Sequence, residues 1–268
     1  ISFSRVRLSG DRAVARAGGR ASPEQIAEIR KAYGYDRPFH EQYLSWVGRF
    51  VAGDFGRSTY LKEDVGPVLA RHIPITATLG VLALAFALLV AVPLGVIAAL
   101  WPNTIIDRIA LVLAVAGQAM PSFLSSLALI YGFGVMLRWL PVSGTATWQH
   151  YILPAVALGY YAAPAIMRLT RSGMMDVLKS DHVRTARAYG LSPWRVVLRH
   201  GLRHAIIPVV AVATVQFGYM LGGSVVVEAV FSMNGLGNLA WLSIRRYDVE
   251  VIQAILLVIA ATYAVLTL

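Results

Sequence analysis

The sequence predicts an all-α integral membrane protein, and three observations point to this fold class. Hydrophobic residues make up 57% of the 268 residues and charged residues only 14%, and the mean hydropathy is +0.62. A soluble domain of this size carries more charge. Five windows contain no Asp, Glu, Lys or Arg: 73–106, 109–137, 151–167, 205–227 and 251–268. Most of them have the roughly 20 residues that a helix needs to cross a bilayer, so we expect five spans.

The spans divide the chain into two regions. Residues 1–72 are expected to hold the end of a first span and an extracytoplasmic segment with short helices, and residues 73–268 to form the transmembrane domain. Because the chain opens at Ile1 without methionine and stops at Leu268 inside an apolar run, we expect a further span before Ile1. The absence of cysteine excludes disulfides and thiolate metal sites.

The first short helix is predicted by SPEQIAEIRKAYG. Ser22 suits the N-cap and Pro23 the first helical position. Gln25 stands where a capping box needs its second member, and Gly34 suits the C-terminal cap. These signals predict a soluble helix outside the membrane.

A second helix is predicted after Pro38, over FHEQYLSWVGRFVAG, with Gly53 to end it. Its apolar side chains recur on one face at helical spacing: Phe39, Tyr43, Trp46, Val47 and Phe50. Trp and Tyr favour the membrane surface. This face therefore lies either on the membrane or against the transmembrane bundle or a partner chain.

The distribution of Lys and Arg predicts the topology. Residues 168–203 hold eight Lys or Arg and two Asp, and short cytoplasmic connections are enriched in positive charge. This connection and the turn at 101–108 are therefore placed inside, whereas 141–150, 231–250 and the region before residue 73 are placed outside. The net charge of +10 follows mainly from topology and not from binding nucleic acid; recognition of lipid headgroups is left open as an added role.

The basic inner connection predicts two helices around a tight turn. Only Gly173 interrupts a helix over 172–189, and Gly190 suits the left-handed conformation that ends it. Ser192 then offers its side-chain oxygen as an N-cap, and Pro193 suits the first position of a second helix that continues into the next span.

The turn between these helices forms a compact basic surface. Its members are small, basic or aromatic: Arg184, Thr185, Ala186, Arg187, Ala188, Gly190, Leu191, Ser192 and Trp194, with Tyr189 and Arg195 beside them. Such a surface fits a groove on a cytoplasmic partner whose carboxylates meet the arginines. The alternative is that a loop between spans carries basic residues for topology alone.

The stretch DHVRTARAYGLSPWRVVLRHGLRHAIIPVV resembles the cytoplasmic signature loop of ATP-binding cassette (ABC) importer permeases, in detail the dipeptide, oligopeptide and nickel permease family and its dipeptide permease B type. Other segments resemble that family in the same order: GDFGRS (53–58), MPSF (120–123), LPVSG (140–144), ILPA (152–155), MRLTRSGMMDVL (167–178), VEAVFSMNGLGNL (227–239) and RRYDV (245–249). The generic importer signature has Glu-Ala-Ala where this chain has Arg184, Thr185 and Ala186. That departure is typical of the peptide-permease branch.

The resemblance implies a type I ABC-importer transmembrane domain of six helices, five of them clearly present here, with residues 171–205 as the cytoplasmic coupling loop. It implies a multi-pass subunit of the prokaryotic cytoplasmic (inner) membrane. Its implied partners are the lipid membrane, a second homologous permease, two cytoplasmic ATP-binding cassette ATPases and an extracytoplasmic substrate-binding protein.

The motor is expected on other chains. This sequence has no G-x-x-x-x-G-K-[ST] phosphate loop, so we expect a permease and not an enzyme, with ATP and Mg bound by partner subunits and no cofactor in this chain. ATP-driven closure of the motor would move the loop as a lever and tilt the attached helices. Gly190 is expected to be its most sensitive residue, because a β-branched side chain opposes the left-handed turn.

Polar residues and one proline within the apolar windows are candidates for a translocation path or gate. They are Gln118, Pro121, Ser122, Ser125, Ser126, Gln216 and Ser224, with Glu228 at the outer end of its span. Polar groups inside lipid usually face the bundle interior, and Pro121 should kink a long span. The alternative for each Ser or Gln is a hydrogen bond to a neighbouring helix. For Glu228 the alternatives are solvation, helix capping or part of an outer gate.

Gly218 and Gly222 form a G-x-x-x-G pattern, which favours close helix contact with the second permease or within this chain. The histidines show no metal-ligand spacing, and we expect no metal site. No nucleophile, base and carboxylate stand together as catalysis would need.

The resemblance predicts di- or oligopeptides as substrates, with nickel chelates and glutathione as alternatives in the same family. An ion-coupled secondary transporter is a different class, and it usually carries a charged residue in mid-span, which these windows lack. A membrane-anchored enzyme would need a nucleophile, metal or phosphate constellation that the sequence does not contain.

Overall fold

The computed structural model describes residues 22–32 and 38–267 and divides the chain into two compact units. The bundle unit comprises Pro74–Asn238 and Ala261–Leu268, and the loop unit comprises Ile1–Ile73 and Leu239–Ala260. Within the described residues every regular element is a helix, apart from one isolated bridge between Arg57 and Asp64. The predicted all-α fold class is confirmed.

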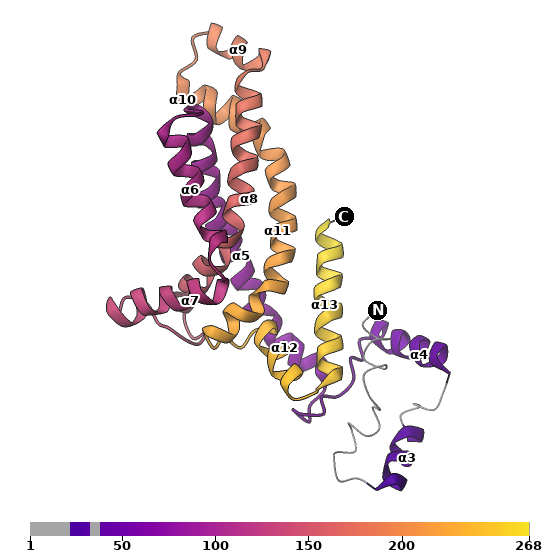
Figure 1. Ribbon diagram of the computed structural model, residues 1–268. Helices are drawn as coiled ribbons and strands as arrows, with labels where there is room; N and C mark the ends of the chain where they lie inside the picture. The colour runs from indigo at the N-terminus through magenta and orange to yellow at the C-terminus, as the bar shows by residue number, and fades with distance from the viewer. Residues whose placement is uncertain (1–21, 33–37, 268) are drawn as a thin grey trace. The chain divides into compact units, whose positions relative to one another are not determined.

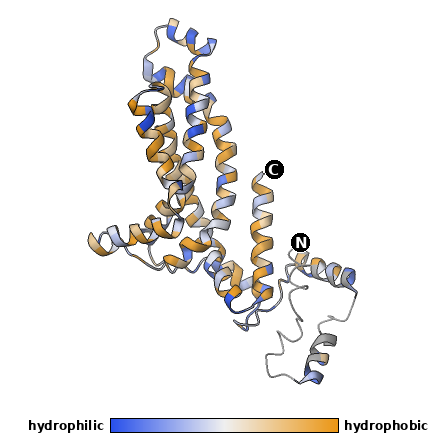
Figure 2. Ribbon diagram, in the orientation of Figure 1, coloured by the Kyte–Doolittle hydropathy of each residue, from blue (hydrophilic) through white to orange (hydrophobic). Residues whose placement is uncertain are grey.

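Four described helices are long and apolar enough to cross a membrane. They are α5 (Val65–Leu100), α8 (Ile152–Leu178), which follows the short 3-10 turn η2 (Trp148–Tyr151), α11 (Arg203–Val230) and α13 (Val249–Thr267) (Figure 1). Hydrophobic residues dominate their length (Figure 2). They cover four of the five predicted windows. Helices form there because a chain in lipid must satisfy its backbone hydrogen bonds within each segment.

The remaining predicted window, 109–137, does not form one straight helix. It contains α6 (Ile105–Ala119), α7 (Ser122–Leu129) and the π-helical segment η1 (Ile130–Met136), and the chain bends by 103° between α6 and α7. Met120 is extended, at φ −103° and ψ 134°, as a residue before proline prefers. The predicted kink at Pro121 is confirmed, but it replaces the single predicted span by two helices, and α7 leaves the bundle sideways (Figure 1).

Small residues bring the helices of the bundle unit close together. α5, α6, α8 and α11 lie side by side (Figure 1) around a core rich in alanine. Gly159 of α8 lies against the carbonyl group of Ala83 in α5, where an added Cβ would overlap it. Gly117 of α6 lies against Tyr160 of α8, whose carbonyl oxygen would be 2.5 Å from an added Cβ. Close packing of this kind holds helices together in lipid, where the hydrophobic effect does not.

The first predicted N-terminal helix is α3 (Pro23–Ala32), and it begins with the predicted capping box. The Gln25 backbone N–H donates to Ser22 Oγ at 3.3 Å, and the Ser22 N–H donates to Gln25 Oε1 at 3.1 Å. These bonds satisfy two donors of the first turn. The predicted stop at Gly34 lies outside the described residues.

The second predicted N-terminal helix is α4 (Phe39–Val51). Gly53 follows it with φ +81°, the left-handed conformation expected where the helix stops. On the predicted apolar face, Tyr43 is exposed, whereas the Phe50 ring packs edge-on against Phe55 at 5.1 Å between centroids. Part of this face therefore packs within the loop unit. The side chains of Phe39 and Trp46 lie outside the described part.

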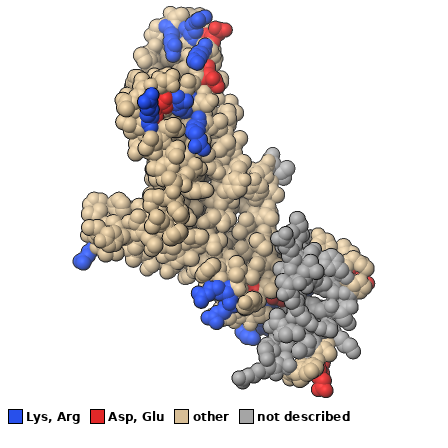
Figure 3. Space-filling view, in the orientation of Figure 1, with Lys and Arg blue, Asp and Glu red and all other residues tan. Residues whose placement is uncertain are grey.

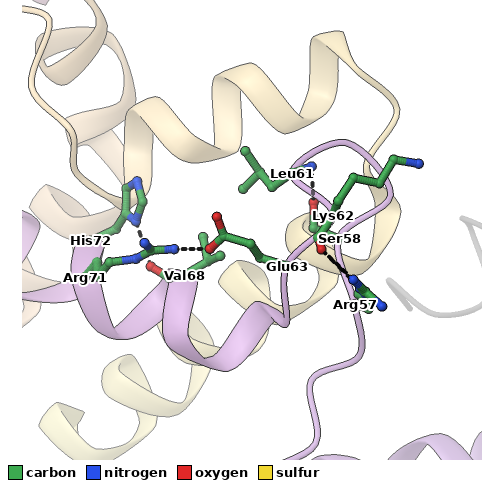
Figure 4. Close-up of polar contacts among 8 residues, drawn as sticks. All are labelled: Arg57, Ser58, Leu61, Lys62, Glu63, Val68, Arg71 and His72. Carbon is green, nitrogen blue, oxygen red and sulfur yellow. Dashed lines mark hydrogen bonds and ion pairs between the residues drawn. The ribbon is translucent and has the colours of Figure 1, made fainter.

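A folded loop follows α4 in the loop unit. Asp248 is buried and accepts hydrogen bonds from the Ser58 hydroxyl and, at 3.2 Å, from the Tyr60 N–H. The Arg57 guanidinium donates to the Lys62 carbonyl at 2.8 and 3.1 Å (Figure 4). The bond between Ser58 and Asp248 joins GDFGRS to RRYDV, two of the segments that carry the family resemblance.

Candidate coupling loop and translocation path

The basic connection folds into two helices around a turn. α9 (Asp181–Ala188) precedes the turn, and α10 (Pro193–Arg195) follows it and continues through the π-helical segment η3 (Val196–Leu202) into α11. The helix from Pro193 to Val230 is therefore continuous over 38 residues. The predicted tight turn and the helix that follows it are confirmed.

The first of these helices is interrupted where none was predicted. α8 ends at Leu178, and Ser180 is extended, at φ −72° and ψ 156°. The Ser180 hydroxyl donates to the Val177 carbonyl, and α9 then starts with an acidic residue, Asp181. A serine that bonds its own backbone competes with the helix, and an acidic residue favours a new helix start. The prediction of one helix over 172–189 was wrong, because Ser180 and Asp181 together end one helix and start the next.

Gly190 has the predicted left-handed conformation, with φ +73°. An added Cβ would have no neighbour within 4 Å, so the backbone conformation and not the available space calls for glycine here. Ser192 is extended and Pro193 occupies the first helical position, as predicted. The Ser192 side chain, however, makes no capping hydrogen bond, so that part of the prediction was wrong.

The predicted coupling residues divide into an inner and an outer set. Ala186 is buried and packs with Val183 and Val196, and Leu191 lies half-buried against them. These side chains hold α9 onto η3. The exposed members are Arg184, Thr185, Arg187, Ala188, Gly190, Ser192 and Trp194.

The exposed set places aromatic surface beside positive charge. Tyr189 is 82% exposed and Trp194 is 68% exposed. Figure 3 shows Lys and Arg side chains gathered at this end of the bundle unit, which we call the basic end. The contact between Arg184 and Asp181 is long, at 3.8 Å, and fully in solvent. Exposed Tyr, Trp and Arg are the residues most enriched at the centres of protein interfaces.

An ion pair that the sequence reading missed joins α6 to α8 at the basic end. Arg171 Nε and Nη2 donate to Asp107 Oδ1 and Oδ2, each at 2.7 Å, and the Asn103 N–H donates to Oδ2 at 2.9 Å. The Asp107 side chain is 9% exposed. In the sequence, Asp107 stands just before the apolar window 109–137, and Arg171 stands in the basic connection. These positions do not by themselves predict that the two residues pair.

Glu228 anchors the opposite end of the bundle unit, which we call the far end. Its side chain is 0% exposed, which excludes the solvated alternative. Glu228 Oε1 accepts from the Thr76 hydroxyl at 2.7 Å, and Oε2 accepts from the Asn238 N–H at 3.0 Å. Thr76 Oγ1 in turn accepts from the Leu236 N–H at 2.7 Å. Glu228 and Thr76 thus cap the first turn of α12 (Leu236–Arg245) and not the helix that carries Glu228.

The other candidates for the path lie in varied environments. Gln118 and Pro121 are exposed, Ser122, Ser125 and Gln216 are half-buried, and Ser126 and Ser224 are buried. The Ser125 and Ser126 hydroxyls both donate to the Ser122 carbonyl, and the Ser224 hydroxyl donates to the Leu221 carbonyl. These three hydroxyls are satisfied by their own helices and do not bridge to a neighbour.

The G-x-x-x-G pattern contributes one intrachain contact. Gly218 is buried against Tyr263, where an added Cβ would overlap the ring. Gly222 is exposed, and an added Cβ would have no neighbour within 4 Å. Packing within the chain therefore accounts for Gly218 alone.

Two histidines meet at the basic end. The rings of His182 in α9 and His204 in α11 lie 4.9 Å apart, edge to face. Within the described residues, no group of three or more His, Cys, Asp or Glu side chains could hold a metal ion.

Comparison with known proteins identifies relatives of the chain. Residues 91–268 match the family described as binding-protein-dependent transport system inner membrane component. The chain is also 41% identical to the glutathione transport system permease protein GsiC of Escherichia coli K12 over 261 residues, which is 97% of this chain and 85% of the relative. The same values hold for the protein of that name from Salmonella typhi.

Solved structures show the same fold. An inward-facing structure of the MetNI methionine ABC transporter aligns with 74% of this chain and 91% of its own, with a TM-score of 0.63 and 20% identity. An amino acid ABC transporter crystallised with histidines aligns with 75% of this chain and 90% of its own, with a TM-score of 0.56 and 18% identity. The predicted importer fold is confirmed. The chain belongs to the family of membrane components of binding-protein-dependent transport systems, and it is a multi-pass permease subunit and not an enzyme.

Proposed function

We propose that this chain is the permease subunit of an ABC importer that moves short peptides across the prokaryotic cytoplasmic membrane. Glutathione, a tripeptide, falls within this class, and the relatives at 41% identity carry its name. The observation that carries the proposal is the exposed basic and aromatic turn at one end of a bundle whose apolar windows hold no charged residue. A subunit of this kind has a surface for a motor and no motor of its own.

The proposed partners are those that the family implies. Two cytoplasmic ATP-binding cassette ATPases would bind ATP and Mg and contact the coupling loop, residues 171–205, which we place inside by its positive charge. A second homologous permease would complete the pore, and an extracytoplasmic binding protein would deliver the substrate. Residues 1–72 and the far end would lie outside.

The coupling loop is proposed to act as a short lever. Exposed Tyr189, Trp194 and Arg187 would fill a groove on the ATPase, with arginine meeting carboxylates at its rim. The buried Val183, Ala186 and Val196 cluster ties α9 to η3, so the two sides of the turn would move together. Displacement of the turn would then tilt α8 on one side and α11 on the other.

The path is proposed to run along uncharged helices between these ends. The earlier candidates Gln118, Pro121, Ser122, Ser125, Gln216 and Ser224 stay proposals for its lining, and Glu228 for an outer gate. Gln118 and Gln216 have the better case, because amides that are not fully buried keep donors and acceptors available to a peptide backbone.

The test is transport by the assembled complex in proteoliposomes. The chain would be coexpressed and purified with the second permease, the ATPases and the binding protein encoded beside it. Labelled glutathione, a dipeptide, a pentapeptide and a nickel chelate would then be supplied in turn. We expect ATP-dependent uptake of at least one peptide and stimulation of ATP hydrolysis by the same compound. Uptake of the nickel chelate alone would replace the peptide proposal by the metal-chelate alternative.

The same preparation tests the rival transporter class. An ion-coupled secondary transporter would take up substrate when a proton or sodium gradient is imposed without ATP, and it would copurify without ATPase subunits. We expect no uptake under that condition. Gradient-driven uptake without ATP would overturn the importer proposal.

A further inference from the structure

The Asp107 and Arg171 side chains form one of several contacts that hold α6 against α8. Besides this ion pair, the Tyr160 hydroxyl of α8 donates to the Leu113 carbonyl in α6. Further along, Gly117 packs against Tyr160 with no room for a side chain. α6 is therefore held to α8 from the basic end to near its last turn.

The ion pair lies close to the coupling loop. Arg171 is about two helical turns before the end of α8 at Leu178, and α9 begins at Asp181. A two-point pair between a guanidinium and a carboxylate fixes orientation as well as distance. Because the carboxylate is largely buried, solvent screens the pair less than a surface pair. Of the polar contacts described between α6 and α8, this pair therefore lies nearest to the coupling loop.

α6 leads directly to the sharpest bend in the bundle unit. It ends at Ala119, and the chain turns by 103° at Met120 and Pro121 before α7. α7 contacts both α8 and α11 and carries the candidate path residues Ser122 and Ser125. Because the break is only two residues long and proline fixes one of its backbone angles, a movement of α6 would be passed on to α7.

We infer that Asp107 and Arg171 are positioning residues that make α6, and through it α7, follow the movement of the coupling loop. This inference rests on the proposed function, because it takes the basic turn as the point where force enters. It assigns the pair to the coupling of ATP hydrolysis to transport. Neither residue is assigned a contact with substrate.

The chain offers matched control residues. Arg108 follows Asp107 directly, and Arg168 lies one turn before Arg171; both are exposed, and no ion pair involves either within the described residues. Arg108→Gln and Arg168→Gln each remove one positive charge from the same end of the bundle, as Arg171→Gln does. They therefore separate loss of the pair from loss of positive charge.

The first experiment measures substrate molecules transported per ATP hydrolysed in the reconstituted complex. Asp107→Asn and Arg171→Gln are expected to lower this ratio about tenfold, as coupling mutations of this size do, while ATPase subunits still copurify. The exchange Asp107→Arg with Arg171→Asp restores opposite charges and is expected to recover most of the ratio. The two control variants should leave the ratio within twofold.

A second experiment needs no knowledge of the substrate. The chain has no cysteine, so Leu127→Cys in α7 and Leu198→Cys in η3, both about half-exposed, can carry the spin labels used to measure a distance. In the complex we expect the distance distribution to change when an ATP analogue binds. Asp107→Asn should reduce that change by at least half, and the charge exchange should restore it.

The outcomes separate the two proposals. If the unmodified complex shows neither ATP-dependent uptake nor a nucleotide-dependent distance change, the proposed function fails. If it shows the distance change and Asp107→Asn leaves it intact, the positioning role is overturned. The role is equally overturned if the variant transports and hydrolyses ATP at proportionally reduced rates, or if it fails to assemble and the charge exchange does not rescue it, because these results indicate general structural damage.

Discussion

At each end of the bundle unit a carboxylate fixes one helix against another, but the partners of the two carboxylates differ. At the basic end Asp107 meets a cation, Arg171, at two points, and the arginine side chain remains partly accessible to water. At the far end Glu228 is completely buried, and its described partners are a hydroxyl and a backbone N–H. Within the described residues it forms no ion pair with Lys or Arg.

The two carboxylates have different partners because different groups lie beside them. The first turn of α12 presents N–H groups without helical partners and the positive end of a helix dipole, which together favour an anion. No cation is needed, but each donor depends on one acceptor. Replacement of the buried carboxylate at the far end should therefore be costly, whereas the two charges of an ion pair near solvent can be exchanged between its residues.

The largest effect is expected from removing the buried carboxylate. Glu228→Ala leaves the Thr76 hydroxyl and the Asn238 N–H without acceptors in a buried place, and we expect a loss of about 3 kcal/mol in the free energy of unfolding. Thermal unfolding of the detergent-purified chain would measure it. Asp176→Asn, at an exposed carboxylate of α8, is the matched control and should change stability by less than about 0.5 kcal/mol. Equal effects of the two would remove the contrast between the ends.

The next effect concerns association at the basic end. Trp194→Ala is expected to weaken binding of the ATPase subunits by about 2 kcal/mol, because a large exposed aromatic ring at an interface centre contributes that much. The free energy of unfolding should hardly change, since Trp194 is 68% exposed. Titration of the purified permease with the ATPase would measure the affinity. An unchanged dissociation constant would count against the coupling surface.

A smaller effect is expected where the backbone alone sets the requirement. Gly190→Val forces a β-branched residue into the left-handed region and should cost about 1–2 kcal/mol locally. Faster hydrogen exchange in α9 than in α8 would show that the cost falls on the turn. Gly190→Asn is the control, because asparagine tolerates this conformation. If both variants exchanged alike, the positive φ would not be the limiting feature.

The smallest effect on stability is expected at Ser224, one helical turn before Glu228 in α11. Ser224→Ala removes a hydroxyl that bonds only its own helix at Leu221, and the helix backbone keeps its hydrogen bonds without it. We expect stability within about 0.5 kcal/mol of the parent protein, so any change in uptake by this variant reports on the path and not on folding. Unchanged uptake of every compound tested would remove Ser224 from the proposed lining.

Local chemistry made part of the site predictable. The left-handed Gly190, Pro193 at a helix start and the capping box at Ser22 depend on residues adjacent in sequence, and all three are present. The break at Ser180 depends on a local signal too, because a serine followed by an acidic residue favours the end of one helix and the start of another. Pro121 marked the kink, but its angle of 103° depends on what α7 packs against.

The sequence by itself determined the fold class, the number and place of the apolar windows, and the basic turn, because hydropathy and backbone chemistry act over one or a few helical turns. Only the tertiary structure decided that Asp107 pairs with Arg171, that Glu228 caps α12, and that Ala186 faces inward while Tyr189 and Trp194 face out. These facts join residues as far apart as Thr76 and Glu228, and the packing of whole helices sets such distances.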